Sequence, residues 1–168
     1  MKKFDSIWDV TPETAHPRAK ELLGQSFVWN YGDDDSPLGN DMGADTFAAY
    51  LSFRATRPVG GVQHFIRKQL ASHGIPNAHW DLLDTAGLEQ SLNTDNGFAL
   101  LRRDDFIIGL AFAQLLLEGV VDPDVRRRAI AALRRQGTDV VISFRGGGGE
   151  DAWKKQLLEF QRILEAAL

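Results

Sequence analysis

Five aspartates lie within residues 32–45, where they form a dense group of potential ligands or catalysts. The set consists of Asp33, Asp34, Asp35, Asp41 and Asp45. Clustered carboxylates beside glycine-rich turns can coordinate hard cations such as Ca²⁺ or Mg²⁺. The EF-hand pattern is not met, because a loop that starts at Asp33 has Pro37 at its fifth position and Ala44 at its twelfth. We expect no cofactor, and we keep a divalent cation at these carboxylates as an alternative.

Two interpretations compete for this acidic loop, the name used here for residues 32–45. Aspartates often cap helices or close turns through the backbone, and Asp41 or Asp45 is placed to cap a following helix. The other interpretation is a surface for a cation or a protein partner, which the adjacent aromatics Trp29 and Tyr31 would suit. We take these two aromatics and the five aspartates as candidate binding residues, and we assign no catalytic residue.

A second candidate is a run of arginines in the helix predicted to start at Asp122 and Pro123. Arg127 and Arg134 are seven residues apart and share a face, which could contact nucleic acid or an acidic partner. The plainer interpretation is a solvated helix face. The net charge of −4 disfavours nucleic acid as a partner.

A third candidate is the run of four glycines at residues 146–149, between a predicted strand and a predicted helix. This is the layout of a phosphate-binding loop. However, the next residues are Glu150 and Asp151, which would repel a phosphate, where a P-loop has lysine and serine or threonine. We therefore interpret the run as a flexible connector.

Several kinds of site lack their signature in this sequence. There is no cysteine, which excludes disulfides, thiolate zinc sites and cysteine nucleophiles. Neither the H-x-x-x-H or H-E-x-x-H pairs of zinc enzymes nor the G-x-S-x-G motif of serine hydrolases occurs. Whether the chain is an enzyme stays open, and the missing motifs favour the answer no.

These candidates must be positioned by a mainly α fold. We expect one compact domain over residues 1–168, with about six helices and one or two short strands. Residues 139–144 are the best strand candidate, residues 27–31 form either a strand or a packed loop, and residues 77–103 are ambiguous. A helix over residues 104–119 carries the most apolar run and should be central. Further helices are expected at residues 45–57 and, with a clear apolar stripe, at residues 150–168.

The apolar run is about a dozen residues, shorter than the roughly 18 that a membrane span needs. The N-terminus has two lysines but no apolar run behind them, so it does not resemble a secretory signal. We expect a cytoplasmic protein with no membrane partner, and the oligomeric state stays open.

Three stretches together resemble the YfeS-like group, a family of small uncharacterised bacterial proteins linked by similarity to molybdate-metabolism regulators. They are residues 36–45 (SPLGNDMGAD), residues 104–114 (DDFIIGLAFAQ) and the segment from Glu118-Gly119 to Asp122-Pro123. The resemblance covers about residues 27–137. It implies a bacterial, cytoplasmic helical domain and carries no catalytic residue over to this chain.

The leading hypothesis is a non-enzymatic binding or regulatory module whose acidic loop contacts another protein, because that acidic surface would speed association with a basic target. One alternative is a metal-dependent hydrolase that uses the loop carboxylates with His64 or with Asp104 and Asp105. The other is nucleic-acid binding through the arginine helix.

Overall fold

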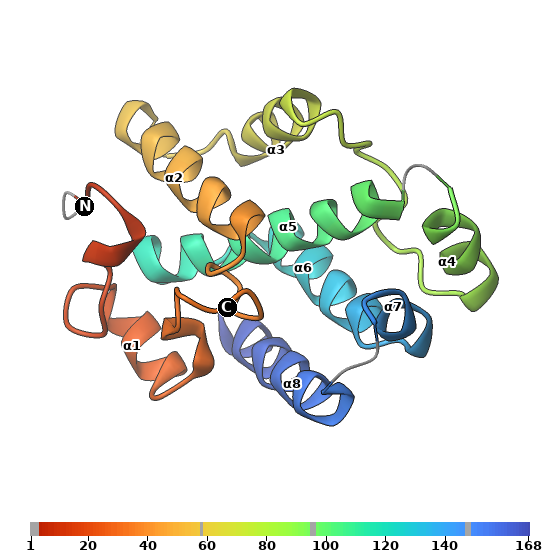
Figure 1. Ribbon diagram of the computed structural model, residues 1–168. Coiled ribbons are helices and arrows are strands. Elements are labelled where there is room, and N and C mark those ends of the chain that lie inside the picture. The colour runs from red at the N-terminus through yellow and green to blue at the C-terminus, as the bar shows by residue number, and fades with distance from the viewer. Residues whose placement is uncertain (1–3, 58, 95–96, 147–148) are drawn as a thin grey trace.

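The fold is built from helices packed around one central helix (Figure 1). The computed structural model describes residues 4–57, 59–94, 97–146 and 149–168. Within these residues the elements are two 3₁₀ turns, η1 (Ile7–Asp9) and η2 (Phe27–Trp29), and the helices α1 (Pro17–Leu23), α2 (Asp41–Thr56), α3 (Val62–Ser72), α4 (Thr85–Leu92), α5 (Gly97–Glu118), α6 (Pro123–Gln136), α7 (Asp139–Phe144) and α8 (Glu150–Ala166). The prediction of a mainly α fold is confirmed.

Neither strand candidate forms a strand. Residues 27–29 form η2, capped by Ser26, and residues 139–144 form α7, capped by Thr138. The Oγ1 of Thr138 accepts a hydrogen bond from the backbone N of Val141, which starts a helical turn. A short β-branched run cannot be told from a buried helical turn by its pattern alone. No strand is present in the part of the chain that the structure describes.

Helix α5 is the central helix, as predicted, and it begins seven residues earlier than the expected start at Asp104. Its apolar residues 106–117 are buried on all sides. Helices α2 and α6 pack most extensively against it, with α2 crossing it, and α4 also packs against it (Figure 1). Polar groups on α5 must therefore find partners inside the protein.

Two glycines let α2 cross α5 at close range. A Cβ atom on Gly109 would lie 2.9 Å from the Cα of Gly43, and a Cβ on Gly43 would collide with the backbone carbonyl of Pro37. These glycines belong to two of the stretches that carry the family resemblance. In this structure the two stretches therefore serve helix packing.

A buried polar network joins the other end of α2 to α5. Arg54 donates from Nε to Glu118 Oε1 at 2.7 Å, and the hydroxyl of Tyr50 donates to the same oxygen at 2.5 Å. Gln114 donates to the Tyr50 hydroxyl at 3.1 Å and accepts from the backbone N of Asp122 at 3.0 Å. Each of these buried groups thus has a hydrogen-bond partner, as a stable core requires.

The C-terminal helix α8 confirms the prediction for residues 150–168 apart from its last two residues. It follows Gly149, whose left-handed φ of 71° suits glycine. Two residues of the predicted glycine connector, 147 and 148, lie outside the described residues. Among the helices described, none is both long enough and apolar enough to cross a membrane.

Candidate ligand-binding pocket

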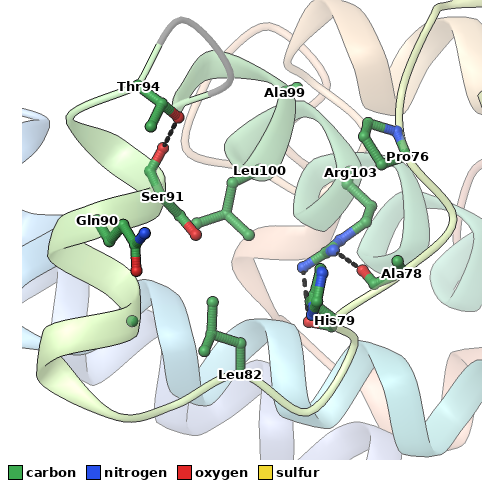
Figure 2. Close-up of a pocket in the computed structure, with 11 residues that line it drawn as sticks. Pro76, Ala78, His79, Leu82, Gln90, Ser91, Thr94, Ala99, Leu100 and Arg103 are labelled. Atoms are coloured by element: carbon green, nitrogen blue, oxygen red, sulfur yellow. Dashed lines mark hydrogen bonds between the residues drawn. The ribbon is translucent and has the colours of Figure 1, made fainter.

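A hollow of about 510 Å³ lies between helix α4, the start of α5 and the segment that joins α3 to α4 (Figure 2). Its lining is mostly apolar, with a few polar groups. The lining residues are Pro76, Ala78, His79, Leu82, Gly87, Gln90, Ser91, Thr94, Ala99, Leu100 and Arg103. Small-molecule pockets are usually concave, mainly apolar and roughly 300–1,000 Å³ in volume, so this hollow has the form of a ligand site.

Arg103 on α5 is the charged group of this pocket, and only 4% of it is exposed. It donates from Nη2 to the His79 carbonyl at 3.2 Å and from Nη1 to the Ala78 carbonyl (Figure 2). Its guanidinium carbon lies 4.8 Å from the ring centre of Trp80. Its buried Nε has no hydrogen-bond partner among the described residues. Arg103 is thus held by neutral groups and keeps a donor unused.

The neighbouring residue Asp104 is fully buried, but its carboxylate is already occupied by an arginine from α6. Arg135 donates from Nε to Oδ2 at 2.8 Å and from Nη2 to Oδ1 at 2.9 Å, a bidentate pair. The closest approach of Arg103 to this carboxylate is 3.8 Å, from Nη2 to Oδ1. Two buried arginines therefore share one buried carboxylate, and only Arg135 is hydrogen-bonded to it.

These two arginines also hold the segment that forms one wall of the pocket. Arg135 donates from Nη1 to the carbonyls of Trp80 at 3.2 Å and Leu82 at 2.6 Å, beside the two carbonyls that Arg103 holds. Within this segment, His79 has a left-handed φ of 57°, which a residue other than glycine adopts only where its surroundings hold it. Side chains from α5 and α6 thus fix a segment that has no helix of its own.

Burial lowers the pKa of Arg103 to about 10, and the nearby Arg135 adds to this effect, while Asp104 opposes it. The cause is the loss of water around a charged group that is not compensated by a close carboxylate. The pocket wall therefore carries a cation in an unfavourable environment, which an anion would relieve.

The structure spreads the predicted acidic residues over a turn and a helix. Asp33 accepts a hydrogen bond from the backbone N of Asp35 at 3.0 Å, which closes a turn. Asp34 and Asp35 are exposed in the loop, and the exposed Asp41 and Asp45 already belong to α2. In residues 4–57, 59–94, 97–146 and 149–168, no three histidine, aspartate or glutamate side chains are grouped to hold a metal ion.

The expectation that Asp41 or Asp45 caps the next helix is wrong. The cap is Asn40, whose Oδ1 accepts from the backbone N of Gly43 at 2.8 Å. Helix α2 therefore starts at Asp41, four residues before the predicted start. Asp41 lies in its first turn, where a negative charge is favourable without any ligand.

The predicted aromatics Trp29 and Tyr31 are half-buried against the core, and their polar atoms bind backbone. The Trp29 Nε1 donates to the Gly24 carbonyl at 3.1 Å, and the Tyr31 hydroxyl donates to the Val10 carbonyl at 2.9 Å. Their polar atoms thus tie residues 29–31 to the preceding chain.

The predicted basic face on α6 is largely paired. Arg127 contacts Asp81 at 2.7 Å and Asp124 at 3.0 Å, and Arg134 lies 3.7 Å from Glu165. Arg135 belongs to the buried pair described above. Arg103 and Arg135 were not among the predicted site residues. One signal was available: Asp104 adjoins the most apolar run of the chain, where a buried acid requires a basic partner.

Comparisons with protein families, with curated proteins and with solved structures find no match for this chain. The resemblance to the YfeS-like group stays a prediction.

Proposed function

We propose that this chain is a non-enzymatic module that binds a small organic molecule in the pocket between α4, α5 and residues 76–82. The main support is an apolar hollow of ligand size whose wall contains the buried guanidinium of Arg103. The proposal keeps the binding-module hypothesis and moves its site from the acidic loop to this pocket.

The polar lining favours binding over turnover. Thr94 Oγ1 donates to the backbone carbonyl of Ser91 at 2.8 Å, so this hydroxyl stabilises the end of α4 (Figure 2). Nucleophilic catalysis needs a hydroxyl next to a base. In the described part of the pocket, neither Ser91 nor Thr94 is hydrogen-bonded to His79.

The test is binding of an uncharged apolar dye such as Nile red, followed by its fluorescence. The wild type should bind it, and Ala99→Trp should abolish binding because the indole fills the hollow. Ala48→Trp, on the exposed side of α2, is the matched control and should bind like the wild type. Equal dye binding by both variants would refute the pocket as the site.

A second candidate is the acidic loop as a surface for a basic protein, supported by the exposure of Asp34, Asp35, Asp41 and Asp45. It predicts salt-sensitive binding of a basic model ligand such as poly-lysine. Changing Asp34 and Asp35 together to asparagine should weaken that binding. Changing Glu21 and Asp151, two exposed acids elsewhere, is the control and should have a smaller effect.

A further inference from the structure

We infer that the ligand of this pocket is an organic monocarboxylate, whose carboxylate binds Arg103 and whose apolar part lies against Leu82 and Leu100. The inference rests on the proposed function and adds the chemical class of the ligand to it. Three observations support it: the absence of a hydrogen-bonded carboxylate at Arg103, the Nε of Arg103 without a partner, and the apolar lining.

The first observation is the missing carboxylate partner of Arg103. Arg103, Asp104 and Arg135 are each at most 4% exposed, and Arg103 is the one of these three charged groups without a hydrogen bond to an opposite charge. A buried charge is stable only when it is paired, and both oxygens of Asp104 already accept from Arg135. A ligand carboxylate next to Arg103 would supply the hydrogen-bonded partner that it lacks.

The donor geometry comes second. Arg135 binds Asp104 through its Nε and Nη2, the two-nitrogen edge that matches a carboxylate. On Arg103 the same edge has an Nε without a partner and an Nη2 that donates to the His79 carbonyl. The Nε is covered by neighbouring protein atoms, so a ligand must displace them to reach it; a carboxylate at this edge would then reproduce the arrangement of the Asp104–Arg135 pair.

The apolar lining comes third, and it separates a carboxylate with an organic body from a small inorganic anion. The Arg103 side chain reaches down one side of the hollow, with Leu100 and Leu82 facing the same space (Figure 2). Ala78, Ala99 and Pro76 complete the apolar surface. Inorganic phosphate would leave these walls without contacts, while an aliphatic acid would cover them.

The experiment is calorimetric titration of the whole chain with octanoate, octanol, octylamine and inorganic phosphate at neutral pH. Octanoate should bind about tenfold or more tightly than octanol, because a hydrogen bond to a charged group adds at least that much. Octylamine and phosphate should bind weakest. In Arg103→Met the preference for octanoate over octanol should disappear, while Arg102→Met, the neighbouring exposed arginine, should keep it.

A second readout works on the wild type alone and does not depend on the folding of a variant. The Nε–H proton of Arg103, assigned by its absence from Arg103→Lys, should shift downfield in nitrogen–proton spectra when octanoate is added. Octanol should leave that proton unshifted.

The outcomes separate the two proposals. Equal binding of octanoate and octanol, with an unshifted Nε–H proton, would overturn the carboxylate assignment and leave the pocket as a site for neutral ligands. Nile red binding that Ala99→Trp abolishes, with no competition by octanoate, would likewise overturn the carboxylate. Failure of Nile red, octanoate and octanol alike to bind would overturn the proposed function and with it this inference.

Discussion

Two buried arginines of this protein, Arg54 and Arg103, differ in one respect that matters for function. Both are at most 6% exposed, and both lie over aromatic rings, at 5.0 Å from the centre of Tyr50 and 4.8 Å from that of Trp80. Arg54 has a carboxylate oxygen of Glu118 at 2.7 Å, whereas the nearest carboxylate oxygen to Arg103 is 3.8 Å away and bound to another arginine.

The pKa shifts of the two arginines follow this difference. Burial alone would lower the pKa of Arg54, but hydrogen bonding to Glu118 and the charges nearby outweigh it, so the pKa is raised. The pKa of Arg103 is lowered to about 10, because burial is not offset in the same way. Arg54 is thus paired within the protein, whereas Arg103 lacks a hydrogen-bonded carboxylate, which is the difference on which the proposed ligand site rests.

The largest effect is expected from removing the buried carboxylate of Asp104, which accepts two hydrogen bonds from Arg135. Asp104→Asn should destabilise the protein by about 3–5 kcal/mol, because Arg135 would lose its partner. Differential scanning calorimetry should show a fall in Tm of about 10 °C. The exposed Arg127→Ala is the control and should change the free energy of unfolding by less than about 1 kcal/mol. If Asp104→Asn lowers the free energy of unfolding by less than about 1 kcal/mol, as expected for the control, the buried Asp104–Arg135 pair does not stabilise the fold.

A smaller effect should distinguish the two arginines directly. Arg54→Met breaks a hydrogen-bonded ion pair and should cost about 3 kcal/mol. Arg103→Met removes hydrogen bonds to two carbonyls, the contact with the Trp80 ring and a 3.8 Å approach to Asp104, and should cost about 1–2 kcal/mol. Urea unfolding of the two variants measures both values. Equal losses in the free energy of unfolding would show that Arg103 is as well paired as Arg54.

The smallest effect concerns Asp105, which lies next to Asp104 but accepts only from the amide of Gln136, at 2.8 Å. Burial raises its pKa to about 6, against an ordinary value of 3.8. The folded state then binds this proton more tightly than the unfolded state, so stability should fall as pH rises from about 4 to 6. Asp105→Asn should flatten that fall and raise stability at neutral pH by about 1 kcal/mol. Thermal unfolding across this pH range tests it, and an unchanged slope would contradict it.

Much of the helical framework follows from local signals in the sequence. Asp122 caps α6 as predicted, with Oδ1 accepting from the backbone N of Asp124 and Val125, and Pro123 begins the helix. The apolar run of α5 and the apolar stripe of α8 also predicted these helices, because the helical period can be recognised over a few turns of sequence. The strand predictions failed where a run of six residues is too short to show a period.

The candidate site could not be read in the same way, because its residues meet only through tertiary contacts. Arg135 lies in a run of arginines that reads as a solvated face, and its burial depends on Asp104, 31 residues away. The pocket wall lies within residues 77–103, for which the sequence predicted no clear helix or strand. Its backbone carbonyls accept hydrogen bonds from side chains of other helices, and such partners leave no local pattern in the sequence. The adjacent aspartates of the acidic loop predicted a binding surface, but most of their side chains are exposed to solvent and are not grouped around one point.

The tethering of residues 78–82 also bears on the order in which the molecule folds. The bonds from Arg135 to the carbonyls of Trp80 and Leu82 close loops of 55 and 53 residues, and they exist only when α5 and α6 are already paired. Closing long loops costs chain entropy before any contact repays it. The pocket wall is therefore expected to dock late in folding, after α5 and α6 have paired.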